Sequence, residues 1–422
     1  MNSSKSESTT PRTDTAPVNI DDVNGLYPID GIDESLPHTN LTPLETIVDG
    51  AQFVGLGESV HTSRGYYQAK FRLFRYLVEQ PGFRAFAIES PWQNAESTRK
   101  YVEGTVNRGN PPKGLFGVWH ARSVANLLNW IRRYNESNGD DPIHLFGYDI
   151  QQPWHDYPAL SKFLNKAVPE RSDDLIDGLE TNIAFEAASG ADFFATDFAA
   201  RMYDHEAESE VRQRYGPCDE GLEAIERLFD EERDELIDAT SKEEFAYAEL
   251  RLVGLRAWMD DVYHSYGLSD LAAGNEARDR GMAFALSRLH ELRCPDAQTA
   301  VWAHNMHLTR AHHRIRGGRS MGTFLAEKLG DEYRCIGLIG RVVETNWNQE
   351  IDEARKPVTD PRAIETMFAS FEQPYLLYDL DCGDLLDPGE TCVLNSWEDV
   401  EPSEQFDALL FVDHSPPRVR LG

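Results

Sequence analysis

The chain has 422 residues, of which 41% are hydrophobic, enough for one large core or for two to three domains. Its 72 acidic and 41 basic residues give a formal net charge of −31, which disfavours a nucleic-acid partner because phosphates need a basic surface. No stretch approaches the ~20 apolar residues of a membrane span, so we expect no membrane partner.

The first 20 residues are rich in serine, threonine and proline and lack the apolar segment of a secretory signal. This composition predicts a disordered tail over 1–20. The five cysteines are scattered, odd in number and form no Cys-x-x-Cys pair, which is typical of free thiols in a reducing compartment. We therefore expect a cytoplasmic protein.

Only nine of the 41 basic residues are lysine, so arginine dominates. An acidic surface around a full apolar core is typical of proteins adapted to high salt, because dissolved ions screen the self-repulsion of such a charge. The sequence thus predicts a halophilic acidic protein, with an ordinary acidic protein as the alternative.

Between residues 43 and 150, helical spacing of apolar residues alternates with short buried runs. In chain order we expect a helix at 43–49, a strand at 52–57, a helix at 62–80, a strand at 83–89, helices at 94–106 and 123–134, and a strand at 143–150. Strands that alternate with helices in this way predict a parallel sheet covered by helices.

The middle of the chain, 155–292, has almost no strand pattern and contains long amphipathic stretches. Helices are expected at 220–237, 242–267 and 275–292, and strands resume at 299–304, 334–339, 375–378 and 408–412. We therefore predict an α/β fold with a mostly parallel sheet flanked by helices. Residues 21–154 and 293–422 form its catalytic core, and 155–292 form a large helical insertion or cap.

Polar side chains, most of them ionisable, follow four of the predicted strands. Ligands of open parallel sheets bind beyond the carboxyl ends of the strands, so these side chains are expected to gather at one edge. They are Glu58, His61, Glu89, Asp149, Gln151, His304 and His307. Convergence of so many titratable groups predicts a functional site.

Histidine is the side chain best suited to exchange a proton near neutral pH, and a nearby carboxylate can hold its tautomer. Glu58 and His61 are three residues apart on a strand-to-helix turn, close enough to cooperate. Lys70 lies on the following predicted helix and could supply a cation, with a solvated lysine as the alternative. Trp119 could line a pocket or belong to the core.

The segment Gly55-Leu-Gly-Glu-Ser-Val-His61 resembles the Gly-Glu-x-x-His signature of the erythromycin esterase family. The similarity covers roughly residues 43–340, through several ordered motifs. These include Phe71–Leu77, Gly82–Glu89, Trp119, Gly147–Gln151, Arg278–Met282, Trp302–His307, Met321–Leu325 and Tyr333–Gly337.

The resemblance implies a hydrolase that opens a macrolide lactone, and so confers antibiotic resistance, by metal-independent attack of an activated water. The family's essential histidine falls on His61, its two glutamates on Glu58 and Glu89, and its later histidine pair on His304 and His307. Lys70 stands where the family commonly has arginine, which puts bidentate carboxylate recognition there in doubt.

On these grounds we expect an ester or lactone hydrolase without cofactor or metal, acting on a small molecule. The expected catalytic residues are His61, Glu58, Glu89, His304 and His307. The expected substrate-binding residues are Lys70, Trp119, Asp149 and Gln151.

Three alternatives remain open. The same Glu and His residues could ligate zinc or manganese in a metal-dependent hydrolase. The stretch Gly318-Arg-Ser-Met-Gly322 matches a Gly-x-Ser-x-Gly nucleophile elbow, with Asp413 and His414 as late partners, although Ser320 fits better as the N-cap of a helix at 321–329. Finally, the cleft could bind a small molecule without turnover.

Overall fold

The computed structural model describes residues 19–106, 111–151, 155–177, 179, 208–268, 270–312, 317–346, 353–354, 357–386, 392–394 and 398–421. The tail predicted at 1–20 lies outside these ranges except for its last two residues. Within the described residues, no helix combines the length and the apolar character of a transmembrane span.

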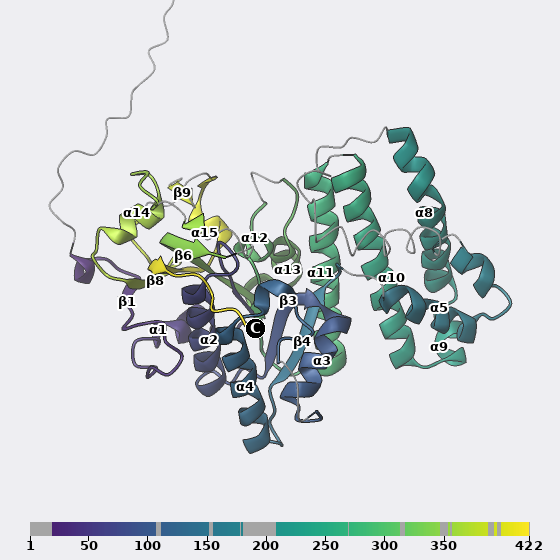
Figure 1. Ribbon diagram of the computed structural model, residues 1–422, viewed down its shortest axis with the longest axis horizontal. Helices are drawn as coiled ribbons and strands as arrows, with labels where there is room; N and C mark the ends of the chain where they lie inside the picture. The colour runs from purple at the N-terminus through teal and green to yellow at the C-terminus, as the bar shows by residue number, and fades with distance from the viewer. Residues whose placement is uncertain are drawn as a thin grey trace, which may run out of the picture.

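The described residues contain a nine-stranded, mostly parallel sheet (Figure 1). Its spatial order is β1 (Leu26–Pro28), β8 (Tyr375–Asp379), β11 (Ala408–Ser415), β6 (Tyr333–Thr345), β2 (Phe53–Leu56), β5 (Thr299–Trp302), β3 (Ala85–Pro91) and β4 (His144–Asp149). All neighbours from β11 to β4 pair in parallel, whereas β8 pairs antiparallel with β11 and with β1. The predicted α/β class is confirmed, as are the seven predicted strands.

Three smaller strands were not predicted besides β1. β7 (Glu353–Ala354) pairs with the end of β6, and β9 (Cys392–Leu394) pairs with β10 (Glu398–Val400) in a separate ribbon.

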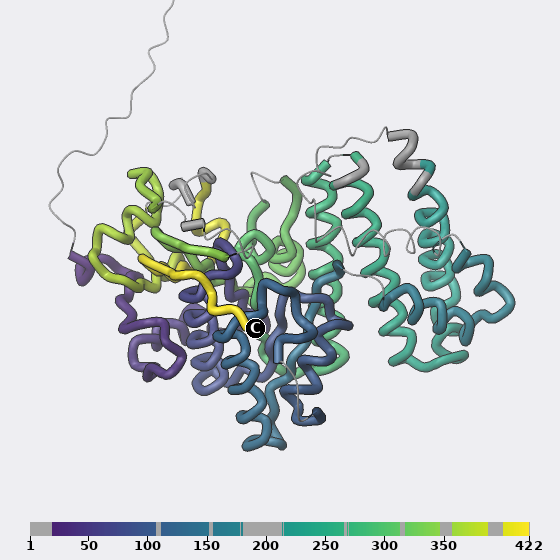
Figure 2. The backbone as a smooth tube through the Cα atoms, in the orientation of Figure 1, coloured from purple at the N-terminus to yellow at the C-terminus, as the bar shows by residue number. Residues whose placement is uncertain are grey.

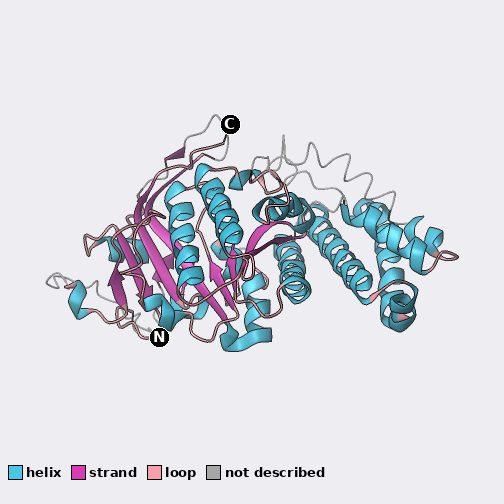
Figure 3. Cartoon of the chain, turned by 90° about the horizontal axis from the view of Figure 1, so that it is seen from below, coloured by secondary structure: helices cyan, strands magenta, loops and turns pink. Residues whose placement is uncertain are grey.

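Helices cover both faces of the sheet, as Figure 3 shows from below. On β3, Phe86 and Ile88 join a core with α2 (Arg64–Glu79) and α4 (Arg122–Ser137), while Ala85 and Ala87 face the opposite core. A strand buried on both faces needs apolar side chains throughout, which explains why these strands read as continuous apolar runs. The shorter helices around the sheet are α1 (Pro43–Ile47), α3 (Trp92–Val102), α12 (Asn305–Leu308), α13 (Met321–Leu329), α14 (Ile364–Ala369) and α15 (Pro402–Gln405).

The described residues of 156–293 form helices joined by short turns, with no strand among them. The helices are α5 (Asp156–Ala167), α8 (Glu208–Glu231), α9 (Arg233–Ala239), α10 (Lys242–Val262), a π-helical turn (Tyr263–Gly267) and α11 (Leu271–Arg293). In Figure 1, α11 lies between the sheet and the block formed by α5, α8, α9 and α10. Because α11 packs on both, it carries side chains from the helical part to the edge of the sheet. The division at 154 and 293 stays a prediction.

Candidate active site

The carboxyl ends of four adjacent strands bring the predicted residues together. β2, β5, β3 and β4 are consecutive in the sheet. Glu58 and His61 follow β2, Glu89 lies near the end of β3, Asp149 ends β4, and His304 follows β5. Parallel strands end at the same edge, so the side chains that follow them converge there.

His61 is paired with a buried carboxylate. Its Nδ1 lies 2.5 Å from Oε1 of Glu58, and the other oxygen of that carboxylate lies 2.8 Å from Nζ of Lys70. Glu58 and Lys70 have no exposed surface, whereas 14% of the His61 side chain is exposed. Because a carboxylate accepts hydrogen bonds, Nδ1 of His61 is assigned as the donor of this one.

Burial lowers the pKa of Lys70 to about 8, and the charge of Glu58 limits the fall. The Lys70 ammonium also lies 4.2 Å from the ring centre of Trp302. At pH 7 the lysine therefore keeps most of its charge beside Glu58.

Glu89 is the second carboxylate of the site. Its Oε1 lies 4.0 Å from Nε2 of His61, 3.5 Å from Nε2 of His307 and 3.4 Å from a guanidinium nitrogen of Arg278. Its Oε2 accepts the backbone N–H of His304 at 2.9 Å. Burial alone would raise the pKa of Glu89, but the charges of His307, His61 and Arg278 outweigh it and lower that pKa to about 2.

His307 is buried between the carboxylates of Asp279 and Glu89. Its Nδ1 is 2.7 Å from Oδ1 of Asp279, opposite the contact of Nε2 with Glu89. Burial would lower the pKa of His307, but Asp279 and Glu89 outweigh it and raise that pKa. Asp279 also accepts the backbone N–H of Met321 at 3.0 Å, which ties α11 to α13.

His304 caps the short helix α12. Its Nδ1 accepts the backbone N–H of Met306 at 3.1 Å, so in the neutral ring the proton resides on Nε2. The His304 and His61 rings lie edge to face with centres 5.2 Å apart. Two imidazoles with different proton positions thus share this edge of the sheet.

The ring of Trp119 packs edge to face against the ring of His61. Its ring centre lies 5.1 Å from that of His61, and its Nε1 donates to the carbonyl of Glu89 at 2.6 Å. Trp119, Lys70 and Asp149 have no exposed surface. They therefore support the site residues that they contact from within the protein. The backbone N–H of Gln151 donates to Asp149 at 2.8 Å. Direct contact of these four residues with a substrate stays a prediction.

Two residues of α11 complete the site and were not among the predicted ones. Arg278 lies 2.5 Å from Asp149 and bridges toward Glu89, and Asp279 holds His307. The side chain of Arg278 is 15% exposed. The segment Arg278–Met282 was among the motifs that carried the family resemblance, and this signal could have identified both residues.

The serine-nucleophile alternative finds no geometric support. Ser320 caps α13 by accepting the backbone N–H of Thr323 at 3.0 Å, as its sequence position predicts. Its hydroxyl donates to the carbonyl of Thr309. His414 contacts Glu344, and Asp413 pairs with Arg341, so neither partner approaches the serine.

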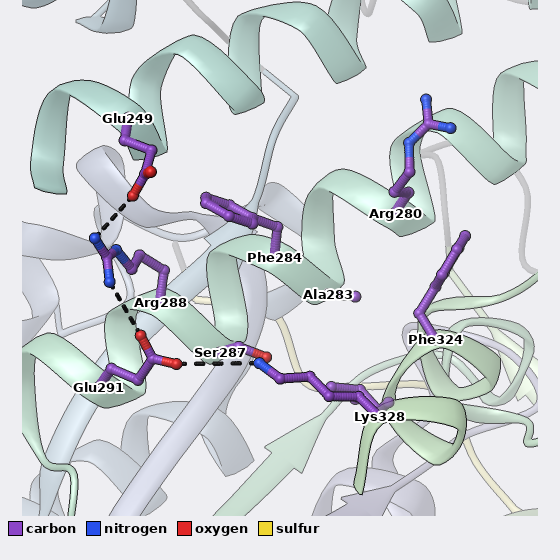
Figure 4. A pocket seen from close by; sticks show the side chains of 10 residues that line it. Glu249, Arg280, Ala283, Phe284, Ser287, Arg288, Glu291, Phe324 and Lys328 are labelled. Atoms are coloured by element: carbon purple, nitrogen blue, oxygen red, sulfur yellow. Dashed lines mark hydrogen bonds and ion pairs between the residues drawn. The ribbon is translucent and has the colours of Figure 1, made fainter. Parts of the chain in front are cut away.

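Within the described residues, no three His, Cys, Asp or Glu side chains converge in the manner of a metal site. A cavity of about 300 Å³ lies elsewhere, between α10, α11 and α13. Figure 4 shows Phe284 and Phe324 at this cavity beside a chain of ion pairs through Glu249, Arg288, Glu291 and Lys328. It contains none of the predicted site residues.

The family model described as erythromycin esterase matches residues 78–415, a range that includes Glu89, Arg278, His304 and His307 and begins after His61. The Bacillus subtilis (strain 168) protein named "Putative hydrolase YbfO" is 22% identical over 424 residues, 93% of this chain and 90% of that protein. Erythromycin esterase type II of Escherichia coli is 22% identical over 315 residues, 71% of this chain and 72% of that protein.

Among solved structures, a mutant of the erythromycin esterase EreC in its open conformation is similar to this chain with a TM-score of 0.72. The two are 19% identical, and the match covers 93% of this chain and 98% of that one. At this identity the likeness shows a shared fold.

Proposed function

The chain belongs to the erythromycin esterase family, and from this premise we propose that it hydrolyses a carboxylic ester or lactone with His61 as the general base. The observation that carries the proposal is the chain of contacts from Lys70 through Glu58 to His61, which ends at a partly exposed imidazole. A histidine that is held by a carboxylate on one nitrogen and open to solvent on the other can take a proton from water and so activate it as a nucleophile.

In the proposed reaction, Nε2 of His61 takes a proton from water while the water oxygen bonds to the carbonyl carbon. The carbonyl electron pair moves onto its oxygen and forms an oxyanion. When the tetrahedral intermediate collapses, the bond to the leaving oxygen breaks and the imidazolium returns the proton to the alkoxide. The products are an acid and an alcohol, joined in one molecule when the substrate is a lactone.

The surrounding charges suit this sequence of steps. Glu58 lies beside Nδ1 of His61, and Glu89 lies 4.0 Å from Nε2. The negative charges of both carboxylates stabilise the imidazolium that forms. His304, with its proton on Nε2, and Arg278, whose side chain is partly exposed, are the proposed donors to the oxyanion. His307 holds Glu89 in place from beneath, and Lys70 acts through Glu58.

The substrate class is drawn from the relatives. Two of them carry the name erythromycin esterase, so a macrocyclic lactone is one candidate substrate and simpler esters are the others.

A panel of aryl and alkyl esters and macrocyclic lactones tests the proposal, with wild type compared with His61→Ala and His414→Ala. His414 is the matched control because it is an exposed histidine that contacts Glu344. We expect His61→Ala to lower kcat by about 10²–10⁴-fold, the usual contribution of a general base. His414→Ala should match wild type.

The other outcomes decide between the alternatives. Equal turnover by wild type and His61→Ala would remove His61 from the mechanism. Loss of turnover in a chelator, with recovery on adding zinc or manganese, would assign the reaction to a metal. Binding of a panel member without any turnover would mark a binding protein.

A further inference from the structure

Residues 416–421, named here the C-terminal strap, cross the turn that follows β2. The backbone N–H of Arg418 donates to the carbonyl of Thr62 at 2.8 Å, and the N–H of Arg64 donates to the carbonyl of Pro416 at 2.8 Å. Figure 2 shows the yellow end of the chain lying against its purple and blue segments. The strap begins where the family-model match ends, at residue 415.

The turn beneath the strap contains a backbone conformation that side chains disfavour. Thr62, the residue after His61, has a φ of 69°, in the left-handed region that L-residues other than glycine rarely enter. Such a conformation persists only where the surroundings impose it. Thr62 is completely buried, so its surroundings can do so.

Three hydrogen bonds hold Thr62 from three sides. Its N–H donates to the hydroxyl of Tyr67 at 2.8 Å, and its carbonyl accepts the N–H of Arg418. Its hydroxyl accepts the N–H of Asn346 at 3.3 Å. Tyr67 lies on α2, Asn346 lies just beyond β6, and Arg418 belongs to the strap.

The side chain of Arg418 ties the same parts together. It is 8% exposed, and its guanidinium donates to the carbonyls of Gly117, at 2.6 Å, and Val118. Its Nε donates to the side chain of Asn346 at 3.2 Å. The carbonyl of Val118 also accepts the hydroxyl of Tyr67 at 2.9 Å. Arg418 therefore links the segment before Trp119 to the two residues that hold Thr62.

We propose that Arg418 and the strap are positioning elements for His61. By fixing Thr62 in the left-handed conformation, they aim the preceding imidazole at Glu58 and Glu89. The inference rests on the proposed function of His61 and adds that the strap sets the geometry of the base.

The first experiment compares Arg418→Ala and Arg418→Lys with Arg227→Ala, an arginine on α8 whose side chain is 63% exposed. We expect Arg418→Ala to lower kcat about tenfold, equivalent to about 1.4 kcal/mol, with little change in KM. Arg418→Lys should recover part of kcat because an ammonium can still donate to the two carbonyls. A kcat for Arg418→Ala equal to that of Arg227→Ala would overturn the proposal.

The second experiment repeats Arg418→Ala in a Thr62→Gly background. Glycine adopts positive φ at little cost, so the turn then depends less on the strap. We expect the loss of kcat on Arg418→Ala to shrink from about tenfold to about threefold or less. An equal loss in both backgrounds would show that Arg418 does not act through Thr62.

Hydrogen exchange gives a readout that needs no substrate. In Arg418→Ala, amides of residues 58–66 should exchange faster than in wild type, while those of α10 should not change. If wild type hydrolyses nothing, the proposed function fails, and faster exchange confined to 58–66 still supports control of the turn by the strap. Exchange that is unchanged there, or faster throughout the chain, would overturn the proposal.

Discussion

At the scale of single residues, Lys70 makes the site sensitive to alkaline pH. Its pKa is lowered to about 8, so the charge that holds Glu58 is lost as the pH rises through that value. We expect hydrolysis to decline there. Lys70→Arg should extend activity to higher pH because a guanidinium stays protonated. Profiles of kcat against pH for the two proteins test this expectation.

The expected decline of hydrolysis above pH 8 is not caused by unfolding that is linked to the titration of Lys70. The unfolded chain keeps the ordinary pKa of 10.5, so between pH 8 and 10.5 it binds more protons than the folded chain. Lys70 therefore favours the folded state increasingly as the pH rises through this window. Superimposable pH profiles for wild type and Lys70→Arg would contradict the role given to the lysine.

The sequence led to most of the candidate site because polar residues stand at or just beyond the ends of apolar strands. Glu58, Glu89 and His304 are of this kind, and the strand order brings them together. Arg278 and Asp279 escaped this reasoning because α11 reads as one of several charged helices. Periodicity shows which face of a helix is apolar but not which partner it packs on.

At the scale of elements, Asp156 links the stability of α5 to pH. It is buried at the start of α5 and accepts a hydrogen bond from Gln93 on α3. Burial raises its pKa from 3.8 to about 7, despite that bond and the charge of Arg251. Its stabilising contribution is complete below pH 3.8 and is lost as the pH rises through about 7.

The variant Asp156→Asn should therefore be more stable than wild type at pH 8, on the order of 2 kcal/mol, and less dependent on pH. Thermal unfolding followed from pH 4 to 8 measures the difference. Asp174→Asn, at an exposed position, is the control. Parallel stability curves for Asp156→Asn and wild type would refute this assignment.

Prediction of the elements succeeded where the local pattern was long and failed where it was short. All seven predicted strands have buried apolar residues within the main sheet. β1 and β7 contain three and two residues and exist because a neighbouring strand offers hydrogen bonds. A sequence pattern cannot reveal such tertiary pairing.

At the scale of the whole molecule, the net charge of −31 should make stability depend on salt. The Debye length falls from about 10 Å at 0.1 M to about 3 Å at 1 M, which removes most repulsion between surface carboxylates. We expect the melting temperature to rise by several degrees between 0.1 and 2 M potassium chloride. A melting temperature that is flat or falls over this range would argue against adaptation to salt.

The strand order also determines when the candidate active site can assemble during translation. β2 and β3 follow each other along the chain, yet β5 lies between them in the sheet. Until residues 299–302 leave the ribosome, β2 has neither of its neighbours, because β6 is made later still, whereas β3 can already pair with β4. Glu58 and Glu89 then lie beside strands that are not yet joined in one sheet, and the open strand edges can pair with other chains. Assembly of the site is thus a late event in translation, because it waits for β5.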